Sequence, residues 1–174
     1  GYRFGDLSVF IGPATSLAVS AAPGQLIADG SSTSTMSIVA TDAGGNPVPN
    51  QLATFATTKG QLVAASGHPD AAGRVTVQLI APVAPGIANV TASAGAVSQS
   101  VPVTFVVGPP GVLFVAAGPT TLAADGASTS TVRATVLDAL GNPVAGQVVS
   151  FATTLGAIGG SAQASAPTNA NGVA

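Results

Sequence analysis

The sequence predicts an all-β protein built from tandem immunoglobulin-like β-sandwiches, of which the second copy is incomplete in this chain. Three observations support this fold class. Apolar and polar residues alternate in short runs, glycine- and proline-rich segments separate the runs, and the whole pattern recurs after 96 residues. No segment shows a helical period over two turns.

The internal repeat sets the expected domain boundaries. Between residues 17 and 62, a copy shifted by 96 residues aligns without gaps, and 24 of the 46 pairs are identical. A period of this length fits one small sandwich domain and is too long for a solenoid unit. We therefore expect a leading β-strand at residues 1–12, a first sandwich at 13–108 and a second at 109–174. The second copy ends before the counterparts of residues 76–107, so we expect it to lack three strands.

The strands of each copy follow from alternation of apolar residues, and the turns follow from their composition. Residues 36–41 place Met36, Ile38 and Ala40 on one face, and Val132, Ala134 and Val136 are their counterparts. Further strands are predicted around residues 75–79 and 101–107. Turns are expected at residues 42–47, 58–60, 82–86 and 94–95. The count of about seven strands is typical of an immunoglobulin-like sandwich, and Phe55 and Phe151 are predicted to fill the space between its sheets.

The composition excludes several classes of function. Only 6% of residues are charged and the net charge is -2, which excludes a basic footprint for nucleic acid. Cysteine and tryptophan are absent and histidine occurs once, so thiol nucleophiles, multi-histidine zinc sites and disulfides are excluded. The most apolar window, residues 101–118, is interrupted by prolines and glycines, which predicts two strands and a linker and no membrane span.

An enzyme would depend on His68, the single histidine. Ser66 and Asp70 lie nearby in the sequence and suggest a Ser-His-Asp triad. Proximity within a loop does not provide triad geometry, and the second copy has no histidine at this position. We therefore interpret His68 as an exposed loop residue and predict that the chain is not an enzyme and needs no cofactor.

Asp29, Asp42, Asp125 and Asp138 are the candidates for a metal site. Carboxylate oxygens suit calcium, but this ion generally requires several carboxylates together, and each copy has only a few scattered ones. The four aspartates more simply cap turns by accepting hydrogen bonds from neighbouring backbone amides. We predict no bound metal and keep calcium as the alternative.

The ordered motifs resemble a known family. Ala-Asp-Gly with Ser/Thr stands at residues 28–35, Asp-x-x-Gly-Asn-Pro-Val at 42–48, Phe-x-Thr-Thr-x-Gly at 55–60 and Asn-Gly-Val-Ala at 171–174. This order resembles the bacterial immunoglobulin-like (Big-1) repeat of the invasin and intimin group of adhesins. The resemblance covers residues 16–107 and 112–174, and it implies a stalk whose binding head lies elsewhere.

The resulting hypothesis is a structural one. The chain would supply spacer or stalk repeats of an extracellular or cell-surface bacterial fibre or adhesin, and prolines would stiffen its joints. Its partners would be copies of itself or neighbouring immunoglobulin-like repeats, and a host or cell-surface receptor would bind a region outside this chain. The alternative is a carbohydrate- or receptor-binding module of a secreted or phage surface protein, which clusters of surface Trp and Tyr would favour; the sequence has no such clusters.

The opening segment is the candidate for assembly. At the repeat offset, residues 7–11 align with residues 103–107, a predicted last strand. The segment is either the end of a preceding repeat or a strand that adds to an open sheet edge, and with one lysine in the chain such edges carry little protective charge. The assembly candidates are Tyr2, Phe4, Leu7, Val9, Phe10 and Ile11.

Overall fold

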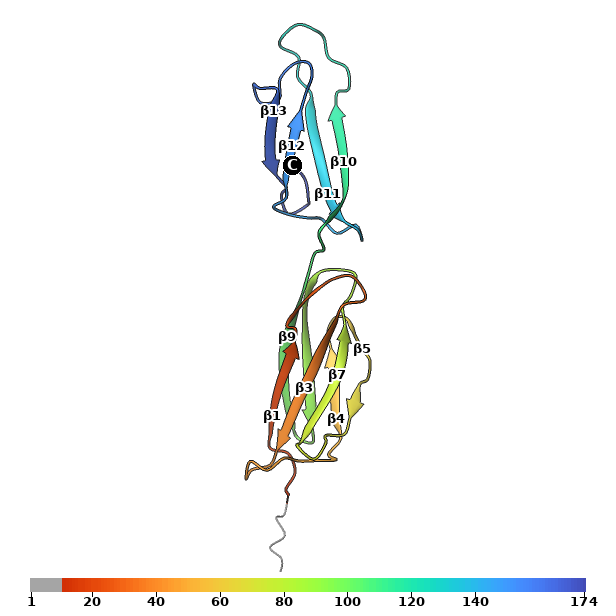
Figure 1. Cartoon of the computed structure of the whole chain (residues 1–174), viewed down its shortest axis with the longest axis vertical. Helices are drawn as coiled ribbons and strands as arrows, with labels where there is room; N and C mark the ends of the chain where they lie inside the picture. Colours follow the sequence, from red (N-terminus) through yellow and green to blue (C-terminus); the bar gives the residue numbers. More distant parts are fainter. Residues whose placement is uncertain (1–10) are drawn as a thin grey trace, which may run out of the picture. The chain divides into compact units, whose positions relative to one another are not determined.

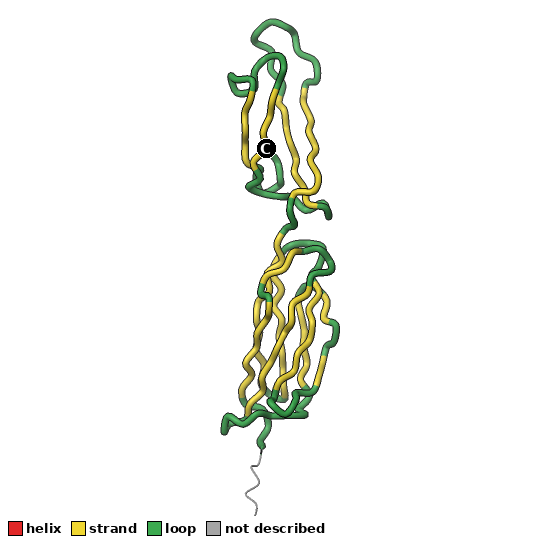
Figure 2. Tube along the Cα trace, viewed as in Figure 1, coloured by secondary structure: helices red, strands yellow, loops and turns green. Residues whose placement is uncertain are grey.

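The computed structural model describes residues 11–174, and these residues form strands, turns and loops only (Figure 2). The chain divides into two compact units between Val106 and Val107. The predicted all-β class is therefore confirmed. The strand expected at residues 1–12 falls almost entirely outside the described residues. No helix among residues 11–174 is long and apolar enough to cross a membrane.

The first unit is a sandwich of two sheets. The four-stranded sheet contains, in spatial order, β1 (Ser16–Ala22), β3 (Thr33–Thr41), β7 (Arg74–Ile80) and β5 (Gln61–Leu62). All of its pairs are antiparallel, and β1, β3 and β7 lie side by side in Figure 1. Residue 36 pairs with residue 77 and residue 38 with residue 75, so the apolar side chains of β3 and β7 share one face.

The second sheet of this unit has five strands. In spatial order it contains β2 (Gln25–Ile27), β9 (Val97–Val106), β8 (Gly86–Ala94), β4 (Ala53–Thr57) and β6 (Ser66–Gly67). β2 and β9 pair in parallel, whereas the other pairs are antiparallel. Because β1 belongs to one sheet and β2 to the other, the chain changes sheets at Pro23 and Gly24.

The core of the first unit lies between these sheets, as the alternation predicts. Met36, Ile38 and Ala40 are fully buried, which confirms the face assigned to β3. Phe55 is only 5% exposed and fills the core as expected. The largest fully buried side chains of the five-stranded sheet are those of Val90, Val103 and Phe105.

The second unit repeats the early part of this plan. β10 (Pro110–Gly118) pairs with β11 (Thr131–Asp138), and β12 (Val148–Ala152) pairs with β13 (Gln163–Pro167). At the repeat offset β10, β11 and β12 correspond to β1, β3 and β4. Ala134, Val136 and Val149 form a small buried cluster, against which Phe151 is only half-buried. Val132, expected on the inner face, is 38% exposed because none of the described residues of this unit covers it.

Candidate functional site: the acidic turns and the open apolar face

Asp42 is the centre of the turn that follows β3. Its Oδ1 accepts hydrogen bonds from the backbone N–H groups of Gly44 and Asn46, both at 2.9 Å. Its Oδ2 accepts one from the N–H of Gly12 at 3.2 Å and one from Asn46 Nδ2 at 3.2 Å. These hydrogen bonds, those from Asn46 foremost, hold the pKa of Asp42 below its ordinary value.

Asp138 reproduces this arrangement in the second unit. Its Oδ1 accepts from the N–H groups of Leu140 at 2.9 Å and Asn142 at 2.8 Å. Its Oδ2 accepts from the N–H of Gly108 at 3.2 Å and from Asn142 Nδ2 at 2.9 Å. Burial of the carboxyl acts to raise the pKa of Asp138, but these hydrogen bonds outweigh it and the pKa lies below its ordinary value.

Asp29 and Asp125 cap a second kind of turn, ahead of β3 and β11. Asp29 accepts hydrogen bonds from the N–H groups of Ser31 and Ser32 and from the Ser32 hydroxyl, at 2.6–2.8 Å. Asp125 accepts the equivalent three from Ala127 and Ser128 at 2.7–2.9 Å. The hydrogen bonds from Ser32 lower the pKa of Asp29, and those from Ser128 foremost lower the pKa of Asp125 to about 2.

The structure therefore places all four calcium candidates in turns, where backbone amides already occupy their oxygens. Among residues 11–174, no group of three or more His, Cys, Asp or Glu side chains comes together as a metal site would require. A cation at any of these carboxylates would compete with the N–H groups that the turn needs to satisfy. The geometry favours the capping interpretation.

His68 is exposed, and its surroundings are those of a loop. Its Nδ1 lies 3.0 Å from the carbonyl oxygen of Asn50. Asp70 uses Oδ1 to accept hydrogen bonds from the N–H groups of Ala72 and Arg74, at 2.9 and 3.0 Å. The aspartate thus shapes the turn that leads into β7, which is a structural task.

In the second unit, an apolar surface is exposed that is buried in the first unit, because the sequence ends before the counterparts of β8 and β9. Leu17 of β1 is 7% exposed, whereas its counterpart Leu113 in β10 is 56% exposed. Leu26 of β2 is 8% exposed, whereas its counterpart Leu122 is 44% exposed. We call the surface made by Leu113, Val115, Leu122 and Val132 the open apolar face.

β9 is the element that covers the equivalent surface in the first unit. It packs against β1 and pairs with β2, where Leu26 stands opposite Phe105. In the second unit, residues 121–123 have the sequence position of β2 but no strand structure. The repeat counterpart of β9 would fall beyond residue 174.

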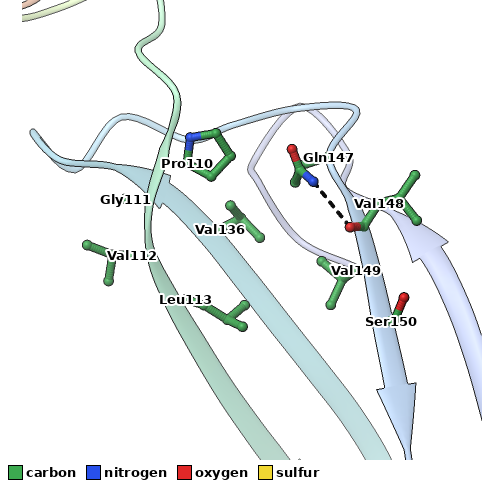
Figure 3. Close-up of a pocket in the computed structure, with 9 residues that line it drawn as sticks. All are labelled: Pro110, Gly111, Val112, Leu113, Val136, Gln147, Val148, Val149 and Ser150. Carbon is green, nitrogen blue, oxygen red and sulfur yellow. Dashed lines mark hydrogen bonds between the residues drawn. The ribbon is translucent and has the colours of Figure 1, made fainter.

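A hollow of about 380 Å³ lies within the second unit, beside this face. Leu113, Val136 and Val149 point into the space between β10, β11 and β12, whereas Val112 and Val148 point away from it (Figure 3). The hollow is lined by Pro110, Gly111, Val112, Leu113, Val136, Gln147, Val148, Val149 and Ser150. Its lining is mainly aliphatic and carries no charged side chain, which suits apolar side chains of a strand better than a polar ligand.

Of the assembly candidates, the structure describes only Ile11, which is 44% exposed and precedes the first strand. Tyr2, Phe4, Leu7, Val9 and Phe10 lie outside the described residues. The sequence interpretation missed the hydrogen bonds that join Gly12 to Asp42 and Gly108 to Asp138. The signal was present, because both the Gly-Pro pair and the Asp-x-x-Gly-Asn turn recur at the same offset of 96 residues.

The comparisons with solved structures find similar bacterial proteins. InvD of Yersinia pseudotuberculosis is 27% identical with a TM-score of 0.56, over 78% of this chain and 41% of that chain. The adhesin InvE of Yersinia pseudotuberculosis is 21% identical with a TM-score of 0.52, over 91% and 49%. Invasin, described as a bacterial integrin-binding protein, is 26% identical with a TM-score of 0.49, over 89% and 34%.

This chain therefore spans half or less of the length of these structures. No curated protein matches the sequence. The profile of the bacterial Ig-like domain (group 1) matches residues 16–106 and 113–174, which is most of the chain and includes both repeats. The chain belongs to the family of bacterial Ig-like domains of group 1, the invasin and intimin type that its motifs resemble.

Proposed function

We propose that the two repeats form part of the stalk of a bacterial surface adhesin or extracellular fibre, where they act as spacers. The observation that carries this proposal is the tandem repetition of one sandwich plan, with 24 identical pairs in 46, across a linker of three residues, 107–109. Tandem repetition of one compact unit lengthens a protein. Membership of the family and the likeness to InvD support the same role.

The proposal assigns the chain no catalytic role. The described aspartates that accept hydrogen bonds lie in turns, which they cap. His68 contacts the backbone carbonyl of Asn50 through Nδ1. The low charge means that the surface is rich in hydroxyls and amides, and in this proposal the receptor would bind a different part of the protein.

Two measurements test the stalk proposal. Antibodies against the 174-residue chain should label intact cells of the source bacterium, and labelling that requires permeabilised cells would overturn an extracellular location. The purified chain should also fail to bind glycan arrays and cultured host cells. Saturable binding there would favour a receptor- or carbohydrate-binding module instead.

For assembly, we propose that the opening segment, residues 2–11, adds as a strand to another immunoglobulin-like repeat, either a preceding repeat of the same chain or, in a second copy, the position at the open apolar face that β9 fills in the first unit. Residues 7–11 occupy the repeat position of residues 103–107, which lie in and directly after β9, and β9 covers this face in the first unit. In that register Val9 corresponds to Phe105 and would stand opposite Leu122, as Phe105 stands opposite Leu26. The strand would provide main-chain hydrogen bonds to residues 121–123 and apolar side chains to the exposed leucines.

A cysteine pair tests this register directly, because the natural chain has no cysteine. A mixture of Val9→Cys and Leu122→Cys proteins should form a disulfide-linked heterodimer under mild oxidation, whereas Ser8→Cys with Leu122→Cys is the control that should link poorly. Deletion of residues 1–11 should abolish concentration-dependent assembly of the full chain. If the deleted protein assembles as the intact one does, these residues are not the joint.

A further inference from the structure

The linker between the two units is attached to the second unit by a side chain. It comprises Val107, Gly108 and Pro109, between the last residue of β9 and the first residue of β10. The N–H of Gly108 donates a hydrogen bond of 3.2 Å to Oδ2 of Asp138, which lies 30 residues further along the chain. This bond joins the linker to the turn between β11 and β12.

The same contact exists at the entrance to the first unit. There the N–H of Gly12 donates to Oδ2 of Asp42, again at 3.2 Å and across 30 residues. Both copies of the repeat thus contain the glycine, the aspartate and the bond between them. Because the contact recurs in both units, it is a feature of the repeat and is not specific to one turn.

The carboxylate that holds Gly108 is itself fixed. Asp138 is only 2% exposed, and three further hydrogen bonds from Leu140 and Asn142 hold its two oxygens. The side chain cannot rotate away from the linker without losing bonds to its own turn. A charged acceptor of this kind forms stronger hydrogen bonds than a neutral one.

The second repeat depends on this bond more than the first does. In the first unit a further tie exists, because the N–H of Ala14 donates to Oε1 of Gln51 at 2.9 Å. In the second unit the counterpart of Ala14 is Pro110, which has no N–H, and Gln147 donates to the carbonyl of Val148 instead. Within the described linker, the bond from Gly108 is therefore the side-chain tie that remains.

We propose that Asp138 is a positioning residue that clamps the linker to the second unit and so restricts the motion of the joint between the two repeats. With Gly108 held and the φ angles of Pro109 and Pro110 fixed by their rings, Val107 is the one residue between the end of β9 and the clamped part of the linker. The clamp goes beyond the proposed stalk role, since it would act in the same way whatever the repeats carry. Asp42 would clamp the segment that precedes the first unit.

The test uses the full chain with one spin label on each unit. Ala56 and Ala152 are exposed strand residues at equivalent positions, and the natural chain has no cysteine to interfere with labelling at Ala56→Cys and Ala152→Cys. Pulsed electron–electron double resonance (DEER) then measures the distribution of distances between the two labels. In Asp138→Asn, an amide NH₂ replaces one carboxylate oxygen and cannot accept the two N–H hydrogen bonds that this oxygen receives. The clamp should weaken, and the distribution of distances between the labels should broaden. Exchange of the Gly108 amide should accelerate about tenfold or more.

Two matched variants control for the loss of a buried or capping carboxylate. Asp125→Asn alters a turn cap of the same unit that does not contact the linker, and Asp42→Asn alters the equivalent clamp ahead of the first unit. Both should leave the distribution between the labels unchanged. Equal widths in Asp138→Asn, Asp125→Asn and the parent would overturn the proposal.

Loss of amide protection in β10 and β11 would reveal that Asp138→Asn unfolds the second unit. In that case, the parent protein provides the test. A Gly108 amide that exchanges as fast as an unstructured peptide in the parent would overturn the clamp. The parent can also be acidified until the Gly108 amide loses its protection. A distance distribution that stays equally narrow after that loss would overturn the effect on the joint.

Discussion

Ala40, near the end of β3, is joined by a backbone hydrogen bond to Gly73, which directly precedes β7. The N–H of Ala40 donates a hydrogen bond of 2.8 Å to the carbonyl of Gly73, and a Cβ atom on Gly73 would collide with the carbonyl oxygen of Ala40. Val136 and Gly172 repeat this relationship in the second unit, with a hydrogen bond of 2.7 Å. Both glycines also have φ near +70°, so the position requires glycine for two separate reasons.

Replacement of Gly73 by alanine should therefore destabilise the first unit strongly. The left-handed backbone alone costs about 1–2 kcal/mol for a residue with a Cβ, and the collision with the Ala40 carbonyl adds to this. Gly45→Ala is the matched control, because Gly45 has φ +78° but no atom within 4 Å of the added Cβ. Urea unfolding of both variants measures the difference, and equal losses would show that the close approach to Ala40 is unimportant.

The two repeats should respond differently to the loss of a phenylalanine. Phe105 is 2% exposed in the core of the first unit, and Phe105→Ala should lower the free energy of unfolding by about 3–5 kcal/mol. Phe114 of β10 is 59% exposed, and Phe114→Ala should change it by only about 0.5 kcal/mol or less. Chemical denaturation checks both values. A large loss in Phe114→Ala would mean that another segment covers β10 in solution.

The capping aspartates predict a loss of stability in acid. The folded-state pKa of Asp125 is about 2, below the value of about 3.9 for an unfolded chain, and the pKa of Asp29 is lowered as well. Because these pKa values are depressed in the folded state, the stabilisation is present above about pH 4 and is lost as pH falls towards about 2. Thermal melting between those pH values measures the slope.

Asp125→Asn serves as the control for this pH dependence. The variant removes one titrating group, so the midpoint of the second unit should fall less steeply with acid than in the parent. An unchanged slope would show that Asp125 does not contribute to the acid sensitivity.

Calcium should have no effect on stability. The oxygens of Asp29, Asp42, Asp125 and Asp138 already accept hydrogen bonds from the turns that they cap, and a cation would have to displace those donors. Melting temperatures in excess EDTA and in millimolar calcium chloride should therefore coincide. A rise of several degrees with calcium, absent with magnesium, would identify a specific site.

The sequence by itself determined the class, the repeat and the local turns. Alternation placed Met36, Ile38 and Ala40 on one face of β3, because side chains of a strand alternate strictly between its two faces. The Asp-x-x-Gly-Asn-Pro motif marked the turn at Asp42, because its hydrogen bonds join residues only a few positions apart. Such features depend on neighbours in the chain, so the chain order is enough to reveal them.

Only the tertiary structure decided which of two identical residues is buried. Leu17 and Leu113 occupy the same place in the repeat, as do Leu26 and Leu122, yet their exposures differ severalfold, because β9 covers Leu17 and Leu26 whereas the counterpart of β9 lies beyond residue 174. The bond from Gly108 to Asp138 joins residues 30 apart: the repeat shows that both residues recur together, but only the structure shows that they are in contact. Burial and linker attachment depend on strands brought together from distant parts of the chain, and local composition carries no record of those neighbours.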